Sequence, residues 1–276
     1  MRGAFLSGLD EHDAGYWRAA VRHMHRLGMD VAIIQTEAYL EPAAGAWTLD
    51  AVGQPLIEAV LDAASGNAMR VFVGLALPES ANGDPQAARD EALIAAIIER
   101  SKESAVRVSD RYGASPAFAG FYLPLETWTP GSPGELGQLP AYLAQLSRHC
   151  RSLAPAKEIA ISPFISDLAT DPMLTETTYT EILTGSEIDV VMMQDGVGAR
   201  AVAVAEFGTR VTPYLIAMKA AADAAGRQMW VNAESFAGDA PAPRARFRAQ
   251  LKLARAVTPS VVTFDYASYC QCAGAR

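Results

Sequence analysis

The hydrophobic positions of this chain fall into short apolar runs that alternate with longer amphipathic stretches. The runs are rich in β-branched and aromatic residues and nearly continuous in apolarity, which is typical of parallel strands buried on both faces. We therefore predict eight strands, over Gly3–Ser7, Asp30–Thr36, Met69–Leu77, Phe118–Glu126, Lys157–Phe164, Ile188–Asp195, Gln228–Ser235 and Ser260–Tyr266.

The stretches between these runs have the period of helices that bury one face. They predict helices over Ala14–Leu27, Gln54–Ser65, Ala87–Tyr112, Gly137–Leu153, Ala201–Ala225 and Arg244–Val257, with a short helix near Thr178–Leu183. Strands that alternate with helices along the whole chain favour an α/β fold, a (β/α)8 TIM barrel formed as one domain by residues 1–276. A doubly wound open sheet is the alternative, but the segment Ser7–His12 is not the glycine-rich phosphate loop that usually follows its first strand.

Composition narrows the range of partners. The chain has 276 residues, half of them hydrophobic, and a net charge of −8 that would repel a phosphate backbone, so a nucleic-acid partner is not expected. It has no apolar run long enough to span a membrane. Met1–Ser7 leads into a strand-like segment without a signal stretch. The chain as given is therefore expected in the cytoplasm, or in the periplasm or medium if a leader was removed; the pattern specifies no oligomeric state.

The sequence predicts neither a metal nor a cofactor. Cys270 and Cys272 are two residues apart, Cys150 is distant, and the histidines lack metal-ligand spacing. We expect reduced, incidental thiols. A serine hydrolase is also disfavoured, because no G-x-S-x-G motif is present.

Two glutamates stand out as candidate catalytic groups. Glu126 ends the fourth apolar run and Glu234 ends the seventh. In a barrel of parallel strands the carboxyl ends of the strands form the active-site face. Two carboxylates that meet there can split a glycosidic bond. Glutamate is also a poor N-cap residue, so helix capping is a weaker explanation for these two positions than for Asp or Ser.

Other side chains near the predicted strand ends are candidates for binding a carbohydrate. Each polar one could instead cap the following helix, which is common at such turns. Trp128 lies beside the Pro/Gly-rich segment Thr129–Gly134 and is expected to stack on a sugar, whereas Trp230 is expected to pack in the core. The predicted substrate-binding residues are Gln35, Glu37, Tyr122, Trp128, Gln194, Asp195 and Asn232.

Five segments of the chain resemble a bacterial family of domains of unknown function, number 4434, whose members are usually described as glycosidase-like TIM barrels. They are Gly3–Leu6, Leu27–Gln35, Phe118–Glu126, Ile188–Gly198 and Trp230–Phe236, and the sequence Gln-Asp-Gly-Val-Gly over 194–198 is the most specific part. The resemblance covers most of the chain.

The chain is also similar to retaining glycosidases that carry an acid/base glutamate after strand four and a nucleophile after strand seven. That similarity implies that Glu126 is the acid/base and Glu234 the nucleophile. Those enzymes usually have Asn directly before the acid/base, where it binds the sugar 2-hydroxyl, and this chain has Leu125 there. Tyr122 or Gln194 could replace that contact.

Two other functions stay open from the sequence. One is a glycan-binding barrel without catalysis, in which the two carboxylates are too far apart to act together. The other is a lyase, isomerase or aldolase acting on a small metabolite, which often uses a lysine at a strand end. Lys157 opens the fifth run and would lie on the opposite face of the barrel.

Overall fold

Eight parallel strands close into a barrel in the computed structural model, which describes residues 1–43 and 46–273, with side chains described outside 42–47 and 271–276. Each predicted apolar run contains one strand, which is shorter than the run. The strands, in their order around the barrel, are β1 (Gly3–Leu6), β2 (Val31–Ile34), β5 (Arg70–Gly74), β6 (Phe118–Tyr122), β7 (Glu158–Ile161), β8 (Val190–Gln194), β9 (Gln228–Glu234) and β12 (Val261–Phe264). β12 pairs with β1, so the prediction of a (β/α)8 barrel is confirmed.

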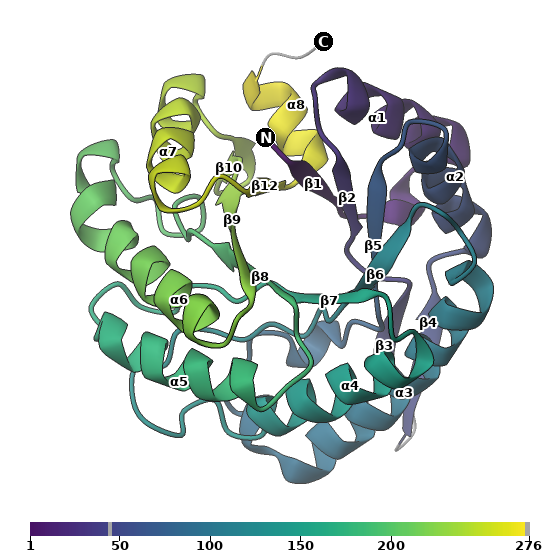
Figure 1. The fold of residues 1–276 in the computed structure, drawn as a ribbon, viewed down its shortest axis with the longest axis horizontal. Coiled ribbons are helices and arrows are strands. Elements are labelled where there is room, and N and C mark those ends of the chain that lie inside the picture. The colour runs from purple at the N-terminus through teal and green to yellow at the C-terminus, as the bar shows by residue number, and fades with distance from the viewer. Residues whose placement is uncertain (44–45, 274–276) are drawn as a thin grey trace.

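Helices surround this barrel on the outside, as Figure 1 shows. The predicted helices are all present, although the one near Thr178 is longer than expected. The helices are α1 (Ala14–Arg26), α2 (Gln54–Ser65), α3 (Glu91–Tyr112), α4 (Leu139–Leu153), α5 (Pro172–Thr184), α6 (Thr212–Ala224), α7 (Arg244–Val257) and α8 (Tyr266–Ala273). Within the described residues, no helix is both long and apolar enough to cross a membrane.

Three helices begin at an aspartate whose side chain accepts a hydrogen bond from a backbone N–H in the first turn. Asp13 precedes α1, Asp90 precedes α3 and Asp171 precedes α5, with N···O distances of 2.8, 3.0 and 2.9 Å. Such caps satisfy N–H groups that have no partner within the helix, and each contributes about 1 kcal/mol. These aspartates therefore define helix starts and are not part of a site.

Alternate side chains of each strand point to opposite faces, and this divides the core into two clusters. One cluster contains only strand residues and fills the barrel; it includes Phe5, Phe72, Met192 and Trp230. The larger cluster joins the outer faces of the strands to the helices. Trp230 packs in the barrel interior as predicted, with its ring 6.1 Å from that of Phe72.

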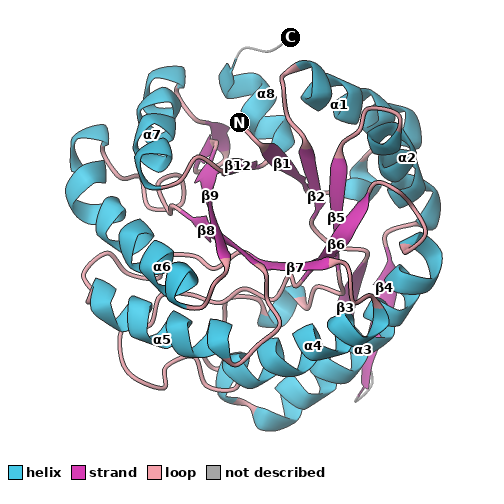
Figure 2. Cartoon of the chain, in the orientation of Figure 1, coloured by secondary structure: helices cyan, strands magenta, loops and turns pink. Residues whose placement is uncertain are grey.

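Two short hairpins were not predicted. β3 (Ala38–Ala43) pairs with β4 (Ala46–Ala51) after β2, and β10 (Phe236–Ala237) pairs with β11 (Ala240–Pro241) after β9. Both follow the carboxyl end of a barrel strand (Figure 2). Loops at this end build the rim of the barrel mouth, so the hairpins add to its walls.

Candidate active site

A cavity of about 310 Å³ opens among the carboxyl ends of the barrel strands. Both candidate catalytic groups, Glu126 and Glu234, line it. Four of the predicted substrate-binding residues line it as well: Gln35, Tyr122, Gln194 and Asn232. The structure therefore brings together six of the nine predicted site residues from four different strands, in the position where TIM barrels carry active sites.

Glu37 lies outside this cavity. Its carboxylate is 3% exposed, accepts a hydrogen bond from Ser104 at 2.5 Å and pairs with Arg107. Both partners belong to α3, so this glutamate ties the chain after β2 to a surrounding helix. A buried carboxylate already paired with a guanidinium is a structural group, and we do not include Glu37 in the proposed site.

Trp128 also lies away from the cavity, with its side chain 2% exposed. Its indole N–H donates to Glu135 at 3.1 Å, and its ring packs against that of Phe164. A ring enclosed in this way cannot stack on a sugar. Phe164 itself lines the cavity, so Trp128 supports an apolar wall from behind.

Asp195 faces away from the cavity too. It follows Gln194 directly, and successive residues of a strand point to opposite sides, so only one of the two can enter the barrel. Gln194 enters it, whereas Asp195 is enclosed between β8, β9 and α7. It contacts Glu234 rather than the cavity.

Glu126 lies in an environment that favours its protonated form. Burial raises the pKa of Glu126, and the hydrogen bond from the Gln194 amide to Oε1 at 3.0 Å opposes this shift only in part. Asn82 accepts a hydrogen bond from the Glu126 backbone N–H at 2.8 Å, which fixes the start of the loop. A carboxyl group with a raised pKa is suited to donate a proton near neutral pH.

Glu234 has different neighbours, although it is also buried. Burial raises the pKa of Glu234, but the backbone N–H groups of Ala199 and Gly198 and the charges of Arg246 and Arg200 all favour its anion. The Ala199 N–H donates to Oε2 at 2.7 Å. Glu126 therefore has a single amide donor, whereas Glu234 has several donors and cations that oppose the effect of burial.

A hydrogen-bond network connects the polar groups at the floor of the cavity. Gln194 Nε2 donates to Glu126 and, at 2.9 Å, to the Ser162 carbonyl oxygen. Asn232 donates to the Ser162 hydroxyl at 3.2 Å, and that hydroxyl donates to the Met192 carbonyl oxygen at 2.8 Å. These contacts fix both amide side chains, so the Gln194 amide presents an N–H, not an oxygen, to Glu126.

Leu125 points away from the cavity into the layer between barrel and helices, where it is 3% exposed. Its neighbours Pro124 and Glu126 line the cavity instead. An amide at this position could not reach a sugar held against Glu126. The loop after β6 therefore leaves no place beside the cavity for a side chain at position 125.

Three polar residues that line the cavity were not among the predicted site residues: Asn82, Ser162 and Arg200. Ser162 directly follows β7, whereas Asn82 and Arg200 come from loops. Arg200 is held by a hydrogen bond from Nε to the Ile165 carbonyl oxygen at 2.8 Å. The turn-forming sequence around Asn82-Gly83 gives no sign of which loop side chains fold over the barrel.

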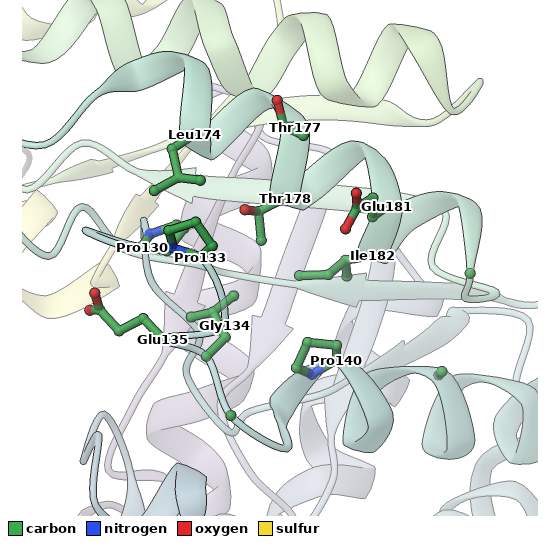
Figure 3. Close-up of a pocket in the computed structure, with 14 residues that line it drawn as sticks. Pro130, Pro133, Gly134, Glu135, Pro140, Leu174, Thr177, Thr178, Glu181 and Ile182 are labelled. Carbon is green, nitrogen blue, oxygen red and sulfur yellow. The ribbon is translucent and has the colours of Figure 1, made fainter.

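A second, larger cavity of about 410 Å³ lies outside the barrel, between the loop after β6 and helices α4 and α5 (Figure 3). Its lining is rich in proline and apolar side chains, and Glu135 and Glu181 are its carboxylates. Glu135 already accepts hydrogen bonds from Trp128 and from two backbone N–H groups of its own loop. Its chemistry is that of a surface groove without reactive groups, so the smaller cavity is the candidate site.

Cations and thiols elsewhere fit structural roles. Lys157 donates to the Phe118 carbonyl oxygen at 2.6 Å at the amino end of the barrel, away from the cavity. Cys150 and Cys270 are free thiols, and the side chain of Cys272 lies outside the described part of the chain. Among the residues that the structure describes, no three His, Cys, Asp or Glu side chains cluster as metal ligands would.

Several solved structures share this fold at low sequence identity. A "putative alpha-L-fucosidase" from Bacteroides thetaiotaomicron matches with a TM-score of 0.76 and 21% identity, over 99% of this chain and 90% of that one. The endo-1,4-beta-D-mannanase of Thermotoga petrophila matches with a TM-score of 0.66 and 12% identity, over 95% and 87%. An intracellular xylanase from Thermoanaerobacterium saccharolyticum matches with a TM-score of 0.56 and 13% identity, over 95% and 84%.

No curated protein matches the chain in sequence. The structural neighbours share its barrel and are named as glycoside hydrolases. The family model described as a domain of unknown function (DUF4434) matches residues 1–274. The chain therefore belongs to the DUF4434 family, as its strand-end segments indicated.

Proposed function

We propose that the protein is a glycoside hydrolase that cleaves a poly- or oligosaccharide by a retaining mechanism, with Glu234 as nucleophile and Glu126 as acid/base. One observation carries this proposal. Two carboxylates, Glu126 after β6 and Glu234 at the end of β9, line one cavity. Burial raises the pKa of both, and more donors and cations favour the anion of Glu234 than that of Glu126. That pair is what a glycosidase needs on the two sides of its scissile bond.

The hydrogen bonds give each carboxylate a step in the reaction. Glu126 Oε1 accepts from the Gln194 amide, so the transferable proton is carried on Oε2. Glu126 donates it to the leaving oxygen as the Glu234 anion attacks the anomeric carbon. Glu126 then removes a proton from the water that releases the sugar from Glu234.

Apolar and amide groups of the cavity suit a carbohydrate. Phe164, Phe236 and Phe264 line it and offer apolar surface to the C–H face of a sugar ring, the role first expected of Trp128. Gln35 and Asn232 supply amide groups for hydroxyls. The fucosidase, mannanase and xylanase names of the structural neighbours are consistent with this class of substrate.

The test is hydrolysis of a set of aryl glycosides, together with reducing-sugar release from polysaccharides. Glu126→Gln is expected to lower kcat/KM by about 10²–10⁴-fold because a general acid is lost. Glu234→Gln should abolish turnover. The matched control is Glu79→Gln, an exposed carboxylate in the loop after β5 that does not line the cavity, and it should retain wild-type rates.

Three results would separate the proposal from its alternatives. Retention of anomeric configuration, followed by proton NMR, supports Glu234 as a nucleophile, whereas inversion would remove that role. Tight oligosaccharide binding without turnover would favour the glycan-binding barrel. Full activity of either glutamine variant would show that the role of that residue is wrong.

A further inference from the structure

Asp195 is a buried carboxylate that neither the cavity nor the proposed chemistry uses. It follows β8 and is 2% exposed. On its far side it faces apolar residues in and around α6 and α7, among them Phe207, Leu215 and Leu253. These two helices lie side by side outside β8 and β9 (Figure 1). Burying a carboxylate among apolar side chains lowers the stability of the fold unless hydrogen bonds compensate it, so the contacts of Asp195 should explain its position.

The contacts of Asp195 converge on the backbone around Glu234. Asp195 Oδ1 accepts from the Glu234 backbone N–H and from the Val197 backbone N–H, both at 3.3 Å. Asp195 Oδ2 accepts from the Gln250 amide, which also donates to the Glu234 carbonyl oxygen at 3.1 Å. The side chains of Asp195 and Gln250 therefore bind the backbone N–H and the backbone carbonyl oxygen of Glu234, respectively.

The same carboxylate also fixes the loop that holds the Glu234 side chain. Val197 is followed by Gly198 and Ala199, whose N–H groups stabilise the Glu234 anion. Gly198 has no room for a side chain, because a Cβ there would lie 2.4 Å from the Phe236 carbonyl oxygen. The loop and the strand end thus pack directly against each other, and the Asp195 carboxylate accepts a hydrogen bond from each of them.

We propose that Asp195 is a positioning residue, which, together with Gln250, clamps the Glu234 backbone and the 197–199 loop so that the Glu234 carboxylate is held for attack. The inference rests on the proposed function, since positioning matters for catalysis only if Glu234 is the nucleophile. Asp195 itself does not touch the substrate, because it does not line the cavity.

The clamp also acts through charge. Burial and the neighbouring Glu234 charge raise the pKa of Asp195 to about 7, while the Gln250 amide and the Glu234 and Val197 N–H groups oppose the shift. The charges of Arg246, from α7, and of Arg200, from the loop after β8, favour the anion of Glu234. The two carboxyls therefore titrate as a coupled pair, in which ionisation of one opposes ionisation of the other.

Asp195→Asn tests the proposal, since it keeps the shape and an acceptor oxygen but removes the charge. Without that charge Glu234 becomes more acidic, so the acidic limb of the kcat/KM pH profile should move to lower pH. Loss of the clamp geometry should lower kcat by about 10–10²-fold, with KM within about threefold of wild type. The matched control is Asp189→Asn, at the opposite end of β8, which should leave the acidic limb and KM unchanged.

A second variant and a second readout keep the test independent of folding and of the substrate. Gln250→Met removes the amide from Asp195 and from the Glu234 carbonyl oxygen but leaves both carboxyls in place, and it should move the acidic limb in the same direction by less. Carbon-13 NMR of labelled glutamate carboxyls, with Glu234 assigned from Glu234→Gln, reports the Glu234 titration even if no glycoside is hydrolysed.

The outcomes separate the clamp from the glycosidase proposal. A lower Glu234 pKa in both variants supports the clamp, and if the wild type hydrolyses nothing, that result leaves the clamp standing while the glycosidase proposal fails. An unchanged Glu234 titration overturns the clamp. So does a variant whose only defect is a higher KM, because that would place Asp195 in substrate binding.

Discussion

The carboxylates at the amino end of the barrel have different partners from the three carboxylates around the cavity. At the amino end, the carboxylates beside the strand starts pair with arginines: Asp30 with Arg2, Glu158 with Arg70, and Asp189 with Arg151. At the mouth, Glu126, Asp195 and Glu234 accept hydrogen bonds from side-chain or backbone amides.

The difference shows which carboxylates serve the fold and which are kept for chemistry. Ion pairs compensate the charges at the amino end. Burial at the mouth leaves the pKa of each of the three carboxyls above its ordinary value. Carboxyls with raised pKa values around one cavity indicate a candidate functional site, and their burial lowers the stability of the fold.

Among variants that keep both glutamates, the largest loss of activity is expected from a methyl group at position 198. Gly198→Ala would place Cβ against the Phe236 carbonyl oxygen, so the loop amides must move away from Glu234. We expect kcat/KM to fall by about 10²-fold. Gly208→Ala is the control, because nothing lies within 4 Å of its Cβ position, and it should be neutral. Equal kcat/KM values for the two variants would show that the 198–199 backbone amides are not needed to hold Glu234.

An amino-end carboxylate should show the reverse pattern. Asp189→Ala removes the acceptor for Arg151 and for the Ile159 backbone N–H, at 2.6 and 2.8 Å. The free energy of unfolding should fall by about 1–3 kcal/mol, since these half-buried donors lose their partner. Activity below the melting transition should persist. Urea denaturation measures the loss of stability, and initial rates on the same preparation measure the activity. A loss of activity without a loss of stability would show that Asp189 serves the reaction and not the fold.

Removing a charge at the mouth should stabilise the protein. Glu126→Gln and Glu234→Gln are each expected to raise the free energy of unfolding at pH 8 by about 0.5–2 kcal/mol. The folded-state pKa of each carboxyl is raised, so wild-type stability falls as pH rises from the unfolded value of 4.5 through the folded value.

Below pH 4 the carboxyl is protonated in both states, and the gain should disappear. Denaturation curves at pH 4 and pH 8 measure this difference. A glutamine variant that is less stable than wild type at pH 8 would indicate that the glutamate serves the fold.

The smallest expected effect is a shift in the pH profile. Gln194→Leu removes the amide that lowers the pKa of Glu126, so the pKa should rise further. As acid catalysis is lost when Glu126 deprotonates, the basic limb of kcat/KM should move to higher pH. A basic limb that stays in place would show that another group limits activity at high pH.

The barrel and its strand-end carboxylates could be predicted because buried parallel strands leave a simple pattern of apolar runs. The alternation within each run carried further information. Gln194 and Asp195, or Leu125 and Glu126, cannot both face the cavity, and the structure places the even-numbered member of each pair inward. The same alternation, continued one residue past the end of β8, predicts that Asp195 points away from the cavity.

Other parts of the site depend on contacts that sequence patterns do not contain. Glu37 is two residues beyond the inward-facing Gln35, yet the chain turns after β2 and takes it to Arg107. Trp128 is buried because its ring packs against Phe164 and its indole N–H donates a hydrogen bond to Glu135. The loop residues Asn82 and Arg200 reach the cavity through tertiary packing alone, which local patterns cannot report.

The measurement that tests the central claim most directly is mass spectrometry of a trapped intermediate. A 2-deoxy-2-fluoro glycoside of the sugar that the wild type hydrolyses, carrying a good leaving group, forms a covalent glycosyl-enzyme that breaks down slowly. We predict that the intact mass rises by one fluorinated sugar and that the label lies on Glu234. A label on any other residue, or rapid turnover of ordinary substrate with inversion and no label, would contradict the account.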